Sequence, residues 1–327
     1  GRLAPSGASC CGGVSLRTEG GTSVTERLPF VDAHHHFWDP PANPHPWLVE
    51  EPMIPFRYGD YSAIRRPFLV ADYQAVAAHQ NVIASVTMEG EWDRRDPVGE
   101  TAWLAGLRER HGTPAAHVAQ AWLDADDVEE VLAAQAAFSF VRGVRHKPRS
   151  AARPDAARPG EPGSMGDPAF ARGYALLARH GFSFDLQTPW WHLEEAAALA
   201  ERHPDIPIIL NHTGLPADRS PEGIAGWRAA LRHFARLPHA AIKISGLGLR
   251  GRPWRLEDNR PIIREAIDIF GTDRAMFASN FPVDSLVGDF DTIIDGFRAA
   301  VADLPREEQA KLFSGNAIRI YRLEGIG

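Results

Sequence analysis

The chain has 327 residues, of which 44% are hydrophobic and 24% are charged, a balance typical of a folded globular protein. Its formal net charge of -7 disfavours a nucleic-acid partner, because phosphate binding needs a basic surface. No apolar run approaches the ~18 residues of a membrane helix, and the first residues lack the apolar core of a signal peptide. These features predict a cytoplasmic protein with neither a membrane nor a nucleic-acid partner.

Residues 1–26 are rich in Gly, Ser and Thr, which predicts a flexible tail ahead of a single folded domain over residues 27–327. The two cysteines, Cys10 and Cys11, are adjacent and lie in this tail. The domain therefore has no disulfide framework, as expected in a reducing compartment.

Beyond the tail, short apolar or β-branched runs alternate with longer stretches of helical period. The runs predict eight strands, over residues 28–35, 81–88, 116–123, 140–146, 182–187, 206–211, 240–245 and 274–279. The helical stretches cover residues 72–79, 99–111, 126–137, 168–180, 192–203, 221–237, 260–270 and 285–302.

Eight strand–helix units of this kind favour an α/β fold of the (β/α)8 type, a TIM-like barrel. Several strands, such as residues 206–210, are continuously apolar, which is typical of parallel strands buried on both faces. A doubly wound dinucleotide-binding sheet would instead need a glycine-rich turn after the first strand. Histidines and prolines occupy that turn here, so we favour the barrel.

Two connections are longer than a plain barrel requires, residues 39–70 and 148–168. Both follow strands and so emerge on the C-terminal face of the barrel, where active sites are built. The first is rich in aromatic residues and is expected to form a lid or pocket wall. The second is rich in Pro, Ala, Arg and Gly, and we expect it to be mobile until a ligand binds.

Polar residues collect at the C-terminal ends of the predicted strands. On a strand, His34 and His36 share one face while His35 takes the other, and two neighbouring imidazoles can hold a metal ion or a water molecule. We expect Lys243 to pair with a buried acid. The other candidate residues at strand ends are Glu89, Arg145, His146, Gln187, Trp190, His212, Asn280 and Asp284.

Four of these strand-end motifs, taken in order, resemble the amidohydrolase superfamily. They read His-x-His-Phe-Trp-Asp from His34, Asn-His-x-Gly from Asn211, Lys-Ile-Ser-Gly from Lys243, and Ser-Asn-Phe-Pro-Val from Ser279. The chain looks most like the lactone-hydrolase branch, which includes sugar-lactone hydrolases and 2-pyrone-4,6-dicarboxylate lactonase. The resemblance covers roughly residues 28–325 and implies a distorted (β/α)8 barrel that hydrolyses an ester-like ring bond.

The resemblance places His34, His36 and His212 around the reacting carbonyl. The aspartate expected after strand eight falls on Asn280, which has no titratable carboxylate and cannot serve as general base. Asn280 can still position water or substrate, and Asp284, four residues on, is the nearest acid. The family mechanism therefore does not transfer to this chain unmodified.

The sequence leaves open whether the protein binds a metal ion. In the superfamily a divalent ion is bound by the same histidines and the missing aspartate, and catalytic zinc usually takes three protein ligands and water. His34, His36 and His212 would supply three nitrogens, with Glu89 as an extra oxygen ligand. The lactone-hydrolase branch also includes members that work without metal, so Zn²⁺ and no cofactor remain alternatives.

The implied activity is hydrolysis of a lactone or related cyclic ester of a small, anionic molecule. Arg145, His146, Gln187 and Trp190 are the expected substrate-binding residues, and the guanidinium group suits a carboxylate. Two alternatives are a metal-dependent decarboxylase of an aromatic or unsaturated acid, and a barrel that only binds a ligand. Barrels of this type often form homodimers.

Overall fold

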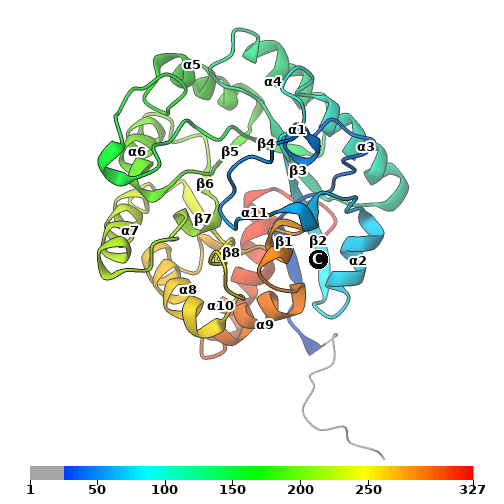
Figure 1. The fold of residues 1–327 in the computed structure, drawn as a ribbon, viewed down its shortest axis with the longest axis vertical. Helices are drawn as coiled ribbons and strands as arrows, with labels where there is room; N and C mark the ends of the chain where they lie inside the picture. Colours follow the sequence, from blue (N-terminus) through cyan, green and yellow to red (C-terminus); the bar gives the residue numbers. More distant parts are fainter. Residues whose placement is uncertain (1–25, 327) are drawn as a thin grey trace, which may run out of the picture.

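The computed structural model describes residues 26–326, and the expected tail lies outside this range apart from Glu26. Eight parallel strands follow one another in the order β1 to β8, as the sequence predicts for a TIM-like barrel (Figure 1). They are β1 (Phe30–His35), β2 (Val82–Met88), β3 (Ala116–Gln120), β4 (Val141–Arg145), β5 (Ser183–Leu186), β6 (Ile208–Leu210), β7 (Ala240–Ile244) and β8 (Ala275–Phe277).

Helices surround the strands, and three of them begin at a side chain that caps the helix. Asp167, Ser220 and Asp289 cap three of them by accepting hydrogen bonds from backbone N–H groups of the first turn. The outer helices are α2 (Val70–Ala77), α3 (Gly99–His111), α4 (Val128–Ala136), α5 (Pro168–Leu176), α6 (Leu193–Glu201), α7 (Pro221–Phe234), α8 (Leu256–Phe270) and α9 (Phe290–Ala300). No helix within residues 26–326 is long and apolar enough to cross a membrane.

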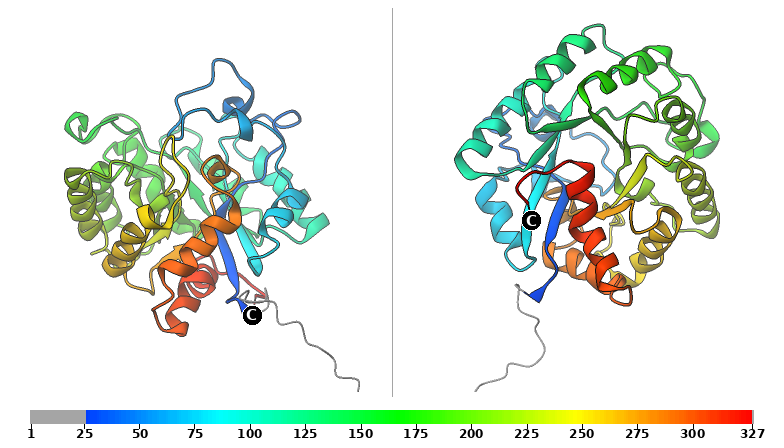
Figure 2. Two further views of the ribbon diagram at one scale, coloured as in Figure 1. Left: turned by 60° about the horizontal axis from the view of Figure 1, so that its bottom comes forward. Right: turned by 180° about the vertical axis from the view of Figure 1, so that it is seen from behind.

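Short helical turns complete the structure, mostly in the connections. Those on the loops are α1 (Pro46–Val49), η2 (Ser62–Ile64), η3 (Pro154–Ala156), η4 (Leu177–His180), η5 (Trp190–His192), η6 (His212–Gly214) and η7 (Val283–Leu286). The chain ends in α10 (Arg306–Ala310), the π-helical turn η8 (Lys311–Gly315) and α11 (Asn316–Ile320). This C-terminal segment, which the sequence patterns did not predict, lies against the back of the barrel (Figure 2).

The core has two layers, because successive side chains of a strand point to opposite faces. Large residues such as Phe184 and Phe277 face the helices, while smaller ones such as Val118 and Ala241 fill the barrel interior. The interior cluster continues into Tyr321, just beyond α11, whose hydroxyl donates to the buried Asp185 at 2.9 Å. The C-terminal segment thus closes the lower end of the barrel.

A bulge in β1 changes which side chains face the interior. Asp32 pairs with Ser85 and His35 pairs with Thr87, so β1 takes three steps where β2 takes two. Asp32 points outward to the Tyr73 hydroxyl of α2, at 2.8 Å, while His34 points inward. Without the extra residue, the alternation would direct Asp32 and His34 to the same side.

The seam between β1 and β8 is closed just beyond the end of β8. Asn280 N–H donates to the His34 carbonyl and His36 N–H donates to the Phe281 carbonyl, both at 2.8 Å. The Asp32 carboxylate accepts from Ser279 N–H at 2.8 Å and from Ser279 Oγ at 2.6 Å. The Asp32 clasp, meaning these bonds together with the Tyr73 bond, therefore fixes Asn280 beside His34.

The two long connections differ in how they are held. Residues 39–70 rise over the C-terminal face of the barrel (Figure 2) and contribute a wall of the central pocket. Residues 148–168 pack on the start of α6, where Glu195 accepts from Gly160 N–H and Ser164 Oγ, and His192 Nε2 accepts from Ala151 N–H. The partners of this segment lie in η5 and α6, and loop composition does not reveal them. The mobility expected of residues 148–168 remains a prediction.

The Asp32 clasp predicts a large stability effect. Asp32→Ala leaves buried donors on Ser279 and Tyr73 without an acceptor, so we expect unfolding free energy to fall by on the order of 3 kcal/mol. Urea unfolding followed by circular dichroism measures the change. Asp126→Ala, at an exposed position, is the control and should be neutral. Equal stability of the two variants would contradict the clasp.

Candidate active site

A pocket of about 350 Å³ opens at the C-terminal ends of the strands. Five of the residues predicted from the sequence line it, namely His36, Arg145, Gln187, His212 and Asn280. The pocket size is suited to a small molecule. The strand ends therefore bring together side chains from widely separated parts of the chain, as a barrel requires.

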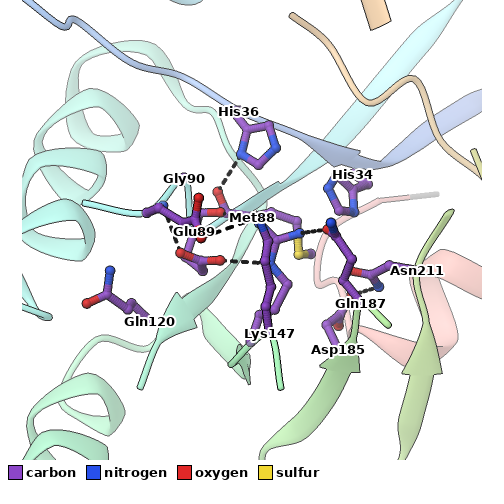
Figure 3. Close-up of polar contacts among 12 residues, drawn as sticks. His34, His36, Met88, Glu89, Gly90, Gln120, Lys147, Asp185, Gln187 and Asn211 are labelled. Atoms are coloured by element: carbon purple, nitrogen blue, oxygen red, sulfur yellow. Dashed lines mark hydrogen bonds and ion pairs between the residues drawn. The ribbon is translucent and has the colours of Figure 1, made fainter. Parts of the chain in front are cut away.

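His36 lies at the pocket surface with its ring orientation fixed. Its Nδ1 is 3.0 Å from the Met88 carbonyl at the end of β2 (Figure 3), and its ring stacks on Trp38 at 5.4 Å. Because a carbonyl only accepts hydrogen bonds, Nδ1 carries the proton in this contact. The Nε2 lone pair is therefore free to accept a proton.

His34 is buried behind this surface and is fully inaccessible. Its ring centroid lies 5.3 Å from that of His36 and 4.5 Å from that of His212. Its Nδ1 faces the Lys243 ammonium group at 3.5 Å, and its Nε2 has no hydrogen-bond partner within the described structure.

His212 sits on η6 in a strained backbone conformation, with φ of 52°. Its Nδ1 is 2.9 Å from Ser245 Oγ, and Thr213 Oγ1 donates to the Ser245 carbonyl. A Cβ on Gly246 would come within 2.8 Å of the His212 side chain. The Lys-Ile-Ser-Gly motif thus supports His212 through its serine, and only glycine allows the close approach.

All three imidazoles are held in the neutral state. Burial lowers the pKa of His34, His36 and His212 well below the ordinary value of 6.5. Nearby cations lower these pKa values further: Lys243 acts on His34 and Arg57 acts on His212. Neutral imidazoles can accept or donate one proton at physiological pH, as catalysis or metal binding requires.

Arg145 forms a buried salt bridge and also lines the pocket. Its Nε donates to Glu89 Oε1 at 2.8 Å, and its Nη1 donates to Gln187 Oε1 at 3.1 Å, while the side chain still lines the pocket. Burial alone would raise the pKa of Glu89, but Arg145 and Lys147 lower it below the ordinary value. Glu89 therefore serves as the counterion of Arg145.

Asn280 replaces the expected aspartate at the pocket surface, and its φ of 55° is one that asparagine tolerates. Its Nδ2 donates to Asp284 Oδ1 at 2.8 Å, and the Tyr58 hydroxyl donates to the same oxygen at 3.0 Å. Arg57 Nη2 lies 3.9 Å from this carboxylate. Asp284 is buried and does not line the pocket, so it orients Asn280 from behind.

Two predicted substrate-binding residues lie away from the pocket lining. His146 Nδ1 accepts from Leu123 N–H at 3.0 Å, and its ring packs between Trp122 and Phe170. Trp190 packs against Gly226 of α7. Their positions next to strand ends suggested the pocket, but both side chains turn toward the helices, which sequence spacing does not reveal.

The sequence reasoning missed two cationic residues of the lining. Arg57 comes from the long connection, where its Nη1 donates to the Gly246 carbonyl at 3.1 Å. Lys147 follows Arg145 and lies 3.6 Å from Glu91. The position of residues 39–70 after strand one was a signal for the pocket, but no pattern distinguished Arg57 within it. The rest of the lining is mostly apolar and includes Trp47, Ile54, Pro55, Phe56, Leu215 and Val283.

The residues present do not fit a zinc site of the family type. No group of three or more His, Cys, Asp or Glu side chains within residues 26–326 is arranged to hold a metal ion. Asn280 supplies no carboxylate, and Glu89 is engaged by Arg145. A metal-ligating histidine normally donates its other ring N–H to an acceptor, as His36 does to Met88, but His34 faces an ammonium group instead.

Comparisons with known proteins agree with the barrel fold. Residues 31–323 match the amidohydrolase family profile. The uncharacterized protein y4mH of Sinorhizobium fredii is 39% identical over 90% of this chain and 99% of its own length. An L-fucono-1,5-lactonase of Burkholderia multivorans is 31% identical over 90% of this chain and 96% of its own length. A crystal structure of a Burkholderia multivorans amidohydrolase with bound zinc has a TM-score of 0.71 and 29% identity, covering 90% of this chain and 99% of that one.

The fold and the pocket at its strand ends thus define an eight-stranded α/β-barrel enzyme of the hydrolase class. The chain belongs to the amidohydrolase family.

The buried Asp284 carboxyl predicts a pH effect on stability. Burial raises the pKa of Asp284 from 3.8 to about 6 in the folded state, so its stabilising contribution is lost as pH rises through about 6. Asp284→Asn still accepts the Tyr58 and Asn280 hydrogen bonds but does not ionise. We expect its unfolding free energy, relative to wild type, to rise by roughly 1.4 kcal/mol between about pH 5 and pH 8.

Urea unfolding at the two pH values measures this difference. Asp126→Asn, at an exposed position, is the matched control and should show a change near zero. A constant difference between Asp284→Asn and wild type would mean that Asp284 titrates normally.

Proposed function

We propose that the protein hydrolyses a lactone of a small, anionic molecule. The observation that carries the proposal is the group of neutral, ligand-facing imidazoles beside a pocket rim that carries three cationic side chains. Membership of the amidohydrolase family and the 31% identity to an L-fucono-1,5-lactonase support the same reaction.

His36 is the general base in this proposal. Its Nδ1–H is committed to the Met88 carbonyl, so Nε2 can take a proton from a water molecule in the pocket. The water oxygen attacks the lactone carbonyl carbon and forms a tetrahedral oxyanion. His36 shares the pocket with the polar groups that would stabilise the oxyanion, although they follow different strands.

His212 lies where it can stabilise the oxyanion, because it shares the pocket with His36 and Asn280. Collapse of the intermediate breaks the bond between the carbonyl carbon and the ring oxygen. The ring oxygen then takes the proton held by His36, and the product is the open hydroxy acid. No group is oxidised or reduced, and the only reactants are water and the lactone.

The remaining polar side chains orient the substrate and the water. Asn280 supplies a neutral amide, oriented by Asp284, so it can hydrogen-bond a water molecule but cannot deprotonate it. Arg57 and Lys147 are partly exposed, at 27% and 32% of the side chain, and carry charges suited to a carboxylate substituent. The pocket lining has a net positive charge, because it contains three cationic side chains and one carboxylate, Glu91. The cations are Arg57, Arg145 and Lys147.

Neither rival is favoured by an observation of its own. A decarboxylase of this scaffold depends on a metal ion, and the donor set described above does not match such an ion. A barrel that only binds ligands would not need an imidazole committed as a proton acceptor, as His36 is.

The decisive variant is His36→Gln, which keeps a polar side chain but removes the proton acceptor. We expect kcat on a hydrolysed lactone to fall by at least ~100-fold with folding unchanged. A pH-indicator assay on a panel of neutral and carboxylate-bearing lactones measures the rate. His233→Ala, at an exposed position of α7, is the control and should keep full activity.

Full activity of His36→Gln would eliminate His36 as the base. Carbon dioxide release from an aromatic acid, with no lactone hydrolysed, would favour the decarboxylase. Ligand binding without any turnover would favour the binding-only alternative.

A further inference from the structure

The two histidines of the His-x-His motif differ in the partner of Nδ1, which is an acceptor for His36 and a donor for His34. His36 Nδ1 contacts a carbonyl, which can only accept a hydrogen bond. His34 Nδ1 contacts the Lys243 amine, which as an ammonium can only donate one. Neutral imidazole carries a single ring proton, so the partner of one nitrogen determines the state of the other.

Lys243 forms an ion pair with the buried carboxylate of Asp185. Its Nζ lies 2.7 Å from Asp185 Oδ2, and both side chains are fully buried. Asp185 also accepts from Asn211 Nδ2 at 2.7 Å and from the Tyr321 hydroxyl at 2.9 Å. Asp185 thus has three hydrogen-bond donors around it, one of which is the Lys243 amine. The close contact with Asp185 makes Lys243 the cationic partner of a buried ion pair.

The Lys243 ammonium faces His34 as well as Asp185. The distance of 3.5 Å to His34 Nδ1 makes a long hydrogen bond, but Lys243 is the partner that Nδ1 has within the described structure. An adjacent ammonium disfavours a proton on Nδ1 and favours the lone pair there, by electrostatics alone. The ring proton then lies on Nε2, the buried atom that lacks a partner in the protein.

We propose that Lys243 is a positioning residue that fixes His34 in the Nε2–H tautomer, opposite to the tautomer of His36. His34 then holds its N–H on Nε2, behind the pocket surface, while His36 presents an acceptor to water in the pocket. The same arrangement works against metal binding, because the Nε2 lone pair that zinc would need is replaced by N–H. The acceptor role of His36 rests on the proposed function, but the tautomer of His34 does not.

Histidine ¹⁵N NMR at neutral pH tests the tautomers directly and requires no substrate. The signals are assigned with His34→Gln and His36→Gln. We expect a protonated Nε2 and an unprotonated Nδ1 for His34, and the reverse for His36, which serves as the internal reference. A protonated Nδ1 on His34 in the wild-type protein would overturn the proposal, even if no variant of Lys243 folds.

The variant Lys243→Met combined with Asp185→Asn removes both buried charges and leaves Nδ1 of His34 without its donor. We expect a mixed or reversed His34 tautomer and a zinc affinity at least about tenfold higher than that of wild type, measured by competition with a chelating dye. Lys243→Arg keeps a permanent donor and should retain both the wild-type tautomer and weak zinc binding.

An unchanged tautomer, or zinc binding no tighter than in wild type, would mean that Lys243 only forms a buried ion pair with Asp185 and does not position His34. Loss of lactone hydrolysis has a different meaning. The predicted tautomers in a protein that hydrolyses no lactone would refute the proposed function and leave the role of Lys243 intact.

Discussion

The site depends on the bulge in β1 and the Asp32 clasp that accompanies it. The extra residue sends Asp32 outward to Ser279 and Tyr73, and it sends His34 inward. The bonds to Ser279 also secure the segment after β8, so that Asn280 N–H reaches the His34 carbonyl. A regular strand would direct Asp32 and His34 to the same side, so His34 would not face the barrel interior.

Burial then determines the chemistry of these side chains. The pKa of each clustered imidazole falls because the charged form is poorly solvated and because cations lie nearby. The Lys243–Asp185 pair lies beneath His34 and brings a charge close to the site without exposing it to water. A buried ion pair of this kind adds little net stability to a protein. The contact between Lys243 and His34 therefore says more about the function of the pair.

Much of the fold could be predicted from the sequence, because strand burial and helix period repeat eight times. The expected pairing of Lys243 with a buried acid is confirmed, since Asp185 lies 2.7 Å away. The C-terminal helices were not predicted, because three short segments around a π-helical turn give no long periodic pattern. The packing of residues 148–168 depends on distant partners, and local composition says nothing about those.

The candidate site was predictable at the level of motifs and less so at the level of side-chain direction. His36, His212 and Asn280 meet at the pocket because strand ends of a barrel converge. His146 and Trp190 occupy equally suggestive positions yet turn away, since direction depends on local register and loop geometry. Arg57 reaches the pocket from a loop, which the sequence pattern did not indicate. The role of Asn280 in place of aspartate depends on its hydrogen bond to Asp284, which only the structure shows.

We propose that neutral histidines activate the water and the lactone carbonyl without a metal ion. The most direct test measures lactone turnover by protein stripped with a chelator, with the metal content checked by elemental analysis of the same sample. We expect lactone turnover to persist at far less than one metal ion per chain and not to rise when zinc is restored. Turnover that disappears on stripping and returns with one equivalent of zinc would contradict it.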